Sequence, residues 1–201
     1  MPLQENGHLM KCHFEKQHSR KSIRLKDYDY SQEGAYFVTI CAYGKKCILG
    51  DVIDWRVELS PIGQIVCAFW FEIPKHFEVV QLDEFVVMPN HVHGIVMITG
   101  KRTSVKCTGV KSNAPTRGND YYSHISPRKD TLSVIVRTYK SAVSRWCRQN
   151  GYKDFRWQRN YYEHVIRNED DLVKIREYIA NNAVKWDLDN ENPAARIEKP
   201  A

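Results

Sequence analysis

The stretch Val86-Val87-Met88-Pro89-Asn90-His91-Val92-His93-Gly94-Ile95-Val96 decides the fold, because it is an apolar, β-branched run that carries two histidines. Successive side chains of a strand point to opposite faces, so His91 and His93 share one face and Val92 points to the other. Pro89-Asn90 predicts a turn before them, which places the pair near an accessible strand end. Two neighbouring imidazoles can hold one divalent metal ion, although a His-x-His pair also occurs on strands that bind no metal.

The sequence around this stretch predicts an α+β protein. β-Branched and aromatic runs predict strands, Ser60-Pro61 predicts a helix start, and amphipathic stretches predict two later helices. Strands mixed with helices favour an antiparallel sheet with helices mainly on one face. We expect strands over 35–41, 47–49, 79–87, 91–98 and 161–167, and helices over 62–73, 131–150 and 169–182, with Pro74 ending the first helix.

The chain of 201 residues fits one domain with decorations. We expect a basic N-terminal arm over 1–33, a domain over 34–183 and a polar tail over 184–201. Residues 100–128 are rich in Lys, Ser, Thr, Asn and Gly, and they predict a mobile insertion within the domain. No apolar run is long enough to span a bilayer, so we expect a cytoplasmic protein without a membrane partner.

The formal net charge is +6, and the basic residues cluster in two regions, Lys11–Lys26 and Arg128–Arg167. Aromatic residues are interleaved with the cations of the second region. Cations contact phosphates and aromatic faces stack on unpaired bases, so this pattern is compatible with a nucleic-acid partner. An ordinary basic surface over core aromatics explains it equally well. The cysteines form no C-x-x-C pair, and a zinc site built from Cys12, His13 and His18 is conceivable.

A metal ion held by two imidazoles needs further ligands, and the last predicted helix supplies candidates. Tyr178 and Asn182 are four residues apart and share one face of that helix. A side-chain amide oxygen suits Mg²⁺ or Mn²⁺, and a phenol beside it can attack a metal-bound phosphate to form a covalent phosphotyrosine. Core packing is the alternative interpretation of Tyr178, and Tyr161 and Tyr162 are rival nucleophiles.

Three blocks of the sequence, in this order, resemble the REP-associated tyrosine transposases of bacteria. These proteins are single-tyrosine HUH transposases related to insertion-sequence enzymes, and HUH denotes two histidines around a hydrophobic residue. The blocks are Met88–His93, Trp157–Asn168 and Ile175–Asn182. Shorter likenesses at Tyr28–Ser31 and Leu59–Gly63 extend the resemblance over roughly residues 20–193.

The resemblance implies a ferredoxin-like HUH endonuclease core with His91 and His93 on a central strand. It implies that Tyr178 is the nucleophile and that His91, His93 and Asn182 hold Mg²⁺ or Mn²⁺. Asn182 stands where insertion-sequence relatives have a glutamine, so the third ligand stays open. The implied activity is cleavage and rejoining of single-stranded DNA at hairpin-forming, REP-like repeats through a 5′-phosphotyrosine, by a nucleoid-associated monomer or homodimer.

Two further expectations concern the DNA and the activity. Phosphate contacts are expected from Arg24, Lys140, Arg159 and Arg167, and His164 either assists the site, contacts DNA or packs. One alternative function is a non-catalytic binder of hairpin DNA or RNA derived from a transposase. Another is a metal hydrolase that uses water to cleave small phosphoesters.

Overall fold

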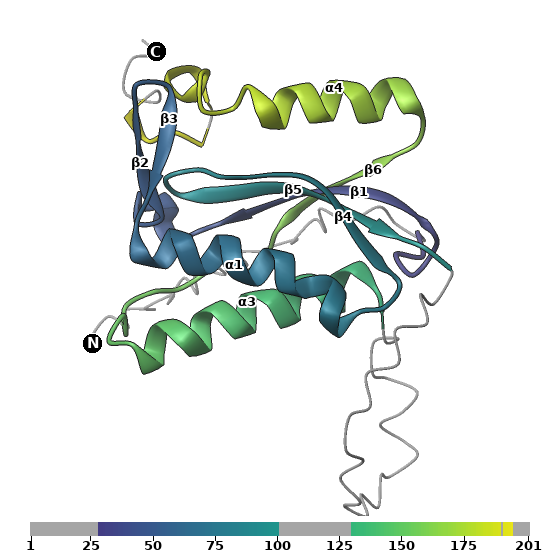
Figure 1. The fold of residues 1–201 in the computed structure, drawn as a ribbon, viewed down its shortest axis with the longest axis horizontal. Coiled ribbons are helices and arrows are strands. Elements are labelled where there is room, and N and C mark those ends of the chain that lie inside the picture. The colour runs from purple at the N-terminus through teal and green to yellow at the C-terminus, as the bar shows by residue number, and fades with distance from the viewer. Residues whose placement is uncertain (1–27, 101–129, 190, 195–201) are drawn as a thin grey trace, which may run out of the picture.

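Four strands form one antiparallel sheet in the computed structural model, which describes residues 28–100, 130–189 and 191–194 (Figure 1). The order of the strands across the sheet is β4-β5-β1-β6. With the two intervening helices, the chain order is β-α-β-β-α-β, the ferredoxin-like α+β fold that was expected. The elements of this core are β1 (Gly34–Cys41), α1 (Pro61–His76), β4 (Val80–Val87), β5 (His91–Ile98), α3 (Leu132–Gln149) and β6 (Tyr162–Ile166), and α4 (Glu169–Ala180) follows them.

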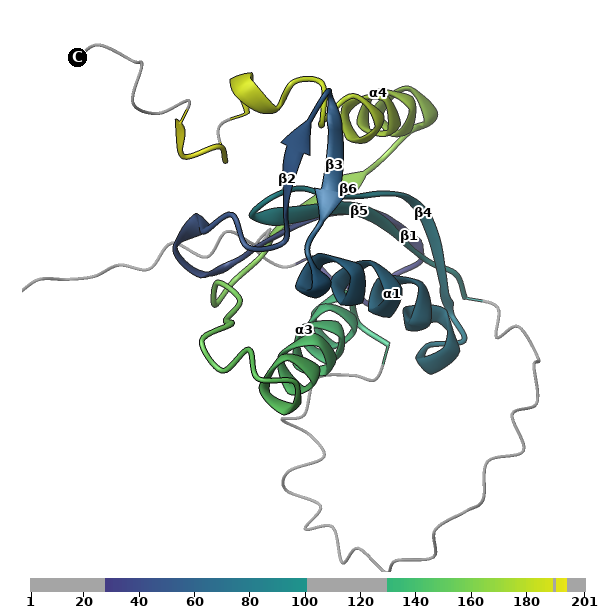
Figure 2. The same ribbon diagram turned by 60° about the vertical axis from the view of Figure 1, so that its left-hand side comes forward.

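The two faces of the sheet are covered differently. Helices α1 and α3 lie side by side on one face, and α4 lies alone on the other (Figures 1 and 2). The α1/α3 face holds the larger apolar cluster, to which β1 contributes Tyr36, Val38 and Ile40. The alternate residue Phe37 belongs to a small cluster under α4. This alternation follows from the two-residue period of a strand.

Helix α1 begins where the sequence predicts. The Ser60 hydroxyl accepts a hydrogen bond from the Gly63 amide at 3.1 Å and donates one to the Ile48 carbonyl at 2.8 Å, and Pro61 occupies the first position. The prediction that Pro74 ends this helix is wrong, because the helix continues to His76. Pro74 removes one intrahelical hydrogen bond in the last turn, but the Phe77 backbone N–H donates to the Ile73 carbonyl and closes that turn.

The prediction of a strand over 47–49 is also wrong. A separate two-stranded hairpin follows that segment, formed by β2 (Gly50–Ile53) and β3 (Arg56–Leu59), and a short 3-10 turn, η1 (Tyr43–Lys45), precedes it. Asp54 and Trp55, which form the turn between β2 and β3, have φ angles of 48° and 64°. Neither is the glycine that usually marks such a turn, so the sequence gives little signal for this hairpin.

Several expectations fall outside the described residues. These are the arm up to residue 27 with Arg24 and the Cys12, His13 and His18 group, and almost all of the 100–128 insertion. Within the described ranges, no helix is long and apolar enough to cross a membrane.

Candidate active site

The two histidines lie on β5, which is an inner strand of the sheet. His91 pairs with Cys41 and His93 with Thr39 in the register between β5 and β1. Both rings point to the α4 face and are buried, with 0% and 3% of their surface exposed. Val92 is fully buried in the cluster on the opposite face. The alternation expected from the sequence is therefore present.

Gly94 allows helix α1 to approach the strand that carries these histidines. A Cβ atom at this position would lie 2.4 Å from Cζ2 of Trp70, which is too close for any side chain. The Trp70 ring instead lies against the sheet, 1% exposed and stacked on Phe85 with ring centroids 4.5 Å apart. Because Gly94 has no side chain, the Trp70 ring can pack directly against β5 on the face opposite the histidines.

Hydrogen bonds to neighbouring residues orient both imidazoles. The Asn90 Nδ2 donates to the carbonyls of Lys45 and Glu191, at 3.0 and 2.8 Å, so its Oδ1 is the acceptor that faces His91 Nδ1 at 2.7 Å. His91 Nδ1 therefore carries the proton, and its Nε2 carries a lone pair. The Nδ1 of His93 lies 2.8 Å from the Thr39 hydroxyl. Such outer contacts fix the tautomer and orientation of metal-binding histidines.

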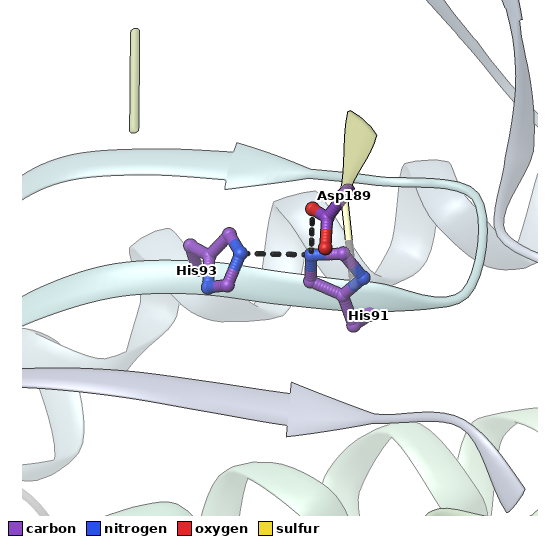
Figure 3. A group of neighbouring side chains, drawn as sticks. All are labelled: His91, His93 and Asp189. Atoms are coloured by element: carbon purple, nitrogen blue, oxygen red, sulfur yellow. Dashed lines mark hydrogen bonds and ion pairs between the residues drawn. The ribbon is translucent and has the colours of Figure 1, made fainter. Parts of the chain in front are cut away.

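The inner nitrogens of the two rings converge. Nε2 of His91 and Nε2 of His93 lie 2.8 Å apart, and Oδ2 of Asp189 lies 3.8 Å from the former (Figure 3). The ligand atoms of His91, His93 and Asp189 all lie within 4.8 Å of one another, which makes them a group that can hold a metal ion. Two adjacent ligand atoms about 2.1 Å from one octahedral cation would be about 3 Å apart.

Two buried oxygens strengthen the fit to a cation. Oδ2 of Asp189 and Oδ1 of Asn182 are buried and find no hydrogen-bond partner among the described parts of the chain. A buried acceptor without a partner is costly, and coordination of a cation would satisfy it. His91, His93 and Asp189 therefore offer two nitrogens and one oxygen to a divalent metal, and Asn182 lines the same pocket as His93 and Asp189.

Tyr178 reaches this group from α4. Its hydroxyl lies 3.2 Å from Nε2 of His93, and its ring meets the rings of His93 and Phe37 edge to face. The Asn168 side chain caps the start of the helix, and Arg176 binds Asp83 of β4 at 2.7 Å. Helix α4 therefore places the Tyr178 phenol next to the histidines of the same chain.

Burial dominates the ionisation of the site. It lowers the pKa of His91 to about 4 against the opposing charges of Asp189 and Glu191, and it lowers the pKa of His93 well below 6.5, with His91 adding to the effect. Both imidazoles are thus neutral at pH 7, as metal ligands must be. Burial, and then the charge of Asp189, raise the pKa of Tyr178, so the phenol holds its proton in the absence of a cation.

A pocket of about 570 Å³ opens in front of Tyr178. Its lining includes the aromatic side chains of Phe37, Tyr161 and Tyr162 and residues of the segment that follows α4. Lys45 and Glu191, which also line the pocket, form a 2.5 Å ion pair. The other lining residues are Thr39, Cys41, His93, Gln158, Asn160, Asn182, Lys185, Leu188 and Asp189.

Among the residues expected to contact DNA, two bind other groups of the protein and two are exposed. The ammonium of Lys140 donates to the carbonyls of residues 158–160 at 2.6 to 3.4 Å, so it holds a loop of the protein. Nε2 of His164 lies 2.8 Å from Asp171 at the start of α4, away from the histidine pair. Arg159 and Arg167 are exposed.

Sequence reasoning missed Asp189, Asn90 and Thr39. Asp189 lies in the predicted tail just after η2 (Trp186–Leu188), where neither periodicity nor a motif singles it out. Asn90 lies inside the quoted stretch, and its position beside His91 was the one available signal. Thr39 is identified only by the register between β1 and β5.

A protein of Haemophilus influenzae, strain Rd, described only as uncharacterized, is 42% identical over 172 residues, which cover 86% of this chain and 92% of that protein. A solved structure of a REP-associated tyrosine transposase bound to a REP hairpin superposes with a TM-score of 0.52 and 20% identity, over 81% of this chain and 74% of the other. The chain belongs to the family of the Haemophilus protein, and its fold is that of the REP-associated tyrosine transposase. The resemblance expected from the sequence is confirmed at the level of this transposase fold.

A putative transposase from Deinococcus radiodurans gives a TM-score of 0.36 at 16% identity, over 79% of this chain and 95% of the other. That similarity is too low to support any statement about the fold of this chain. No model of a known protein family matches the sequence.

Proposed function

We propose that the chain is a metal-dependent nuclease that cuts and rejoins single-stranded DNA at hairpin-forming repeats. Tyr178 is the nucleophile, and His91 and His93 hold a divalent cation together with Asp189 and Asn182. The observation that carries the proposal is the row of three atoms: the Tyr178 hydroxyl lies 3.2 Å from Nε2 of His93, which lies 2.8 Å from Nε2 of His91. The fold shared with a hairpin-bound transposase supports a DNA hairpin as the substrate.

The donor set suits the expected Mg²⁺ or Mn²⁺, and its imidazole nitrogens favour Mn²⁺ of the two. When bound, the cation would withdraw charge from the phosphodiester and favour loss of the phenol proton. Other residues of the chain keep the two imidazoles oriented and neutral, and hold the tyrosine in place. Thr39 and Asn90 orient the two rings, and burial keeps both neutral. The ion pair between Arg176 and Asp83 holds the tyrosine helix on the sheet.

The bond changes balance without any further reagent. The Tyr178 oxygen bonds to phosphorus while its proton passes to water, and the bond between phosphorus and the 3′ oxygen breaks. The 3′ oxygen takes a proton from water and leaves as the hydroxyl end of the upstream fragment, so the downstream part of the strand stays on the tyrosine through its 5′ phosphate. Attack of a 3′ hydroxyl on this phosphotyrosine reverses the step and joins strands.

The test is covalent capture of DNA by the full chain. A single-stranded hairpin oligonucleotide, drawn from inverted repeats beside the gene, is incubated with the protein and Mn²⁺ and run on a denaturing gel. We expect a protein–DNA adduct with the wild type and with Tyr43→Phe, a control at an exposed tyrosine outside the pocket. Tyr178→Phe should form no adduct and bind the oligonucleotide normally, and His91→Ala should lose both cleavage and metal dependence.

Other outcomes would reject the proposal in distinct ways. An adduct formed by Tyr178→Phe would assign the nucleophile to another residue. Binding without cleavage across titrations of Mg²⁺ and Mn²⁺ would indicate a non-catalytic hairpin binder. Cleavage without a covalent intermediate would indicate a hydrolase that uses water.

A further inference from the structure

Besides Tyr178, the pocket is lined by Tyr161 and Tyr162, which the proposed chemistry does not use. Tyr162 is the first residue of β6 and pairs with Thr39, which in turn pairs with His93 across the next strand. The three residues thus form a row across adjacent strands on the α4 face. Two strand spacings place the Tyr162 backbone about 10 Å from that of His93.

The Tyr162 ring remains largely accessible. Its exposed fraction is 55%, although it lines the same pocket as Tyr178. Its contact with Phe37 is edge to face, with ring centroids 6.5 Å apart. Single exposed aromatics are common on protein surfaces and need no explanation. An exposed ring inside a pocket, beside a reactive phenol, is a surface on which a planar group can stack.

The rest of this part of the pocket is polar and held in place. Gln158 and Asn160 bring side-chain amides to the lining, on the loop whose carbonyls accept hydrogen bonds from Lys140. The backbone N–H of Gln158 also donates to the Cys41 carbonyl at 2.8 Å, which fixes the loop and leaves the side-chain amide out of this bond. Lys185, which is exposed, adds a cation to the lining. Amides hydrogen-bond to the edges of bases, and cations contact phosphates.

We propose that Tyr162 holds one unpaired nucleobase of the substrate strand next to the scissile phosphate. The base stacks on the phenol ring, and the amides of the 158–160 loop contact its edge. Every base has a π face, and stacking on an aromatic side chain contributes about 1–3 kcal/mol per base. This inference rests on the proposed function, because it takes a single strand that enters the pocket toward Tyr178.

Equilibrium binding tests the inference without any cleavage. Fluorescence anisotropy in metal-free buffer measures the affinity of the full chain for the flanking-repeat hairpin with single-stranded arms. Tyr162→Ala should weaken binding by about 5- to 150-fold, the range that corresponds to loss of one stacked base. Tyr162→Phe and Tyr162→Trp should bind within about threefold of the wild type, because both keep the ring. Phe71→Ala is the matched control, since Phe71 is 57% exposed on α1, across the sheet.

A series of hairpins with one abasic site each identifies the base. We expect one position in a single-stranded arm at which the abasic site weakens binding by the wild type as much as Tyr162→Ala does. Combining that abasic site with Tyr162→Ala should produce no further loss, since both changes remove the same contact. Thermal melting of the variants confirms that they are folded.

The results separate this inference from the proposed function. If the wild type forms no adduct but the binding data show the non-additive pair, cleavage by Tyr178 is rejected and the base contact remains. If the adduct forms and Tyr162→Ala binds like the wild type, the base contact is rejected alone. Additive losses at every abasic position, or an equal loss with Tyr162→Phe, would also overturn the inference, and absence of any binding would overturn both.

Discussion

The two faces of the central sheet differ in what they bury. The face under α1 and α3 carries the large apolar cluster, with Trp70, Val92 and Val136 almost completely buried. In the described chain, a small apolar cluster lies between the other face and α4, with the buried polar side chains of Thr39, His91, His93 and Asn182 beside it. Apolar burial of about 25 cal/mol per Å² stabilises the first face, whereas buried polar groups at the second reduce that gain.

This difference indicates that one face of the sheet stabilises the fold and the other holds the site. Each strand presents alternate residues to the two faces, so β5 anchors Val92 in the core and holds His91 and His93 at the site. Changes on the α1/α3 face should lower stability, and changes on the α4 face should alter metal or DNA binding. Four measurements test this difference between the two faces.

Trp70→Ala should lower the free energy of unfolding by about 3–5 kcal/mol, because it removes a large buried ring from the α1/α3 face. Urea denaturation followed by circular dichroism measures the change. Phe71→Ala, at the exposed neighbouring position, should cost less than about 1 kcal/mol. Folded Trp70→Ala protein should still gain stability from Mn²⁺. Loss of that response together with stability would contradict the division between the faces.

Acid should destabilise the metal-free protein through the α4 face. The pKa of His91 is lowered to about 4 in the folded chain, against 6.5 for an ordinary histidine, so the unfolded chain binds the proton more readily between these values. Stability present above pH 6.5 should therefore fall as the pH drops toward 4, by on the order of 3 kcal/mol from this group. Urea denaturation at several pH values gives the slope. An equally steep slope in His91→Ala would assign the effect to other groups.

Asp189→Asn should weaken stabilisation by Mn²⁺. An ion at a hundred times its dissociation constant stabilises the folded state by about 2.7 kcal/mol, and a ligand change that weakens affinity about 100-fold removes most of that gain. Melting temperatures with and without Mn²⁺ measure the effect. The control is Asp187→Asn, an exposed carboxylate two residues earlier, which should respond like the wild type. Equal responses from the two variants would exclude Asp189 as a ligand.

Lys140→Met should have the smallest effect, about 1 kcal/mol of stability, because it removes hydrogen bonds to the loop over 158–160. Since this ammonium is engaged by carbonyls of the protein, the salt dependence of DNA binding should keep its slope. The exposed Lys153 provides the comparison variant Lys153→Met for stability. A slope reduced by about 0.7–0.9 would instead make Lys140 a phosphate contact.

Most of the fold was predictable because its elements have strong local signals. The His91–Ile98 strand, the amphipathic helix from Leu132 and the Asn168-capped helix α4 all appear within a residue or two of their expected bounds. The β2–β3 hairpin was missed because Asp54 and Trp55, rather than glycine, occupy its left-handed turn. Helix α1 passes Pro74, although proline is unfavourable inside a helix, because burial of the flanking Ile73 and Phe77 in the core holds the last turn in place.

The site was predictable where residues are close in sequence and unpredictable where only folding brings them together. The spacing of His91 and His93 on a strand is local. Tyr178 lies on α4 as expected, but the expected helix over 169–182 ends at Ala180, so Asn182 follows the C-cap Asn181 and does not lie on the helix. The approach of Asp189 to His91, at 3.8 Å, depends on how the segment after α4 folds back onto the sheet. The loop contact of Lys140 depends likewise on the packing of α3 against residues 158–160.

Mass spectrometry of the trapped adduct identifies the residue that carries the DNA. The full chain is incubated with the single-stranded hairpin and Mn²⁺, digested with protease and nuclease, and the modified peptide is sequenced. We expect a nucleotide 5′-phosphate on the hydroxyl of Tyr178 and nowhere else. A nucleotide on Tyr161, Tyr162 or another residue, or cleaved DNA with no modified peptide, would contradict it.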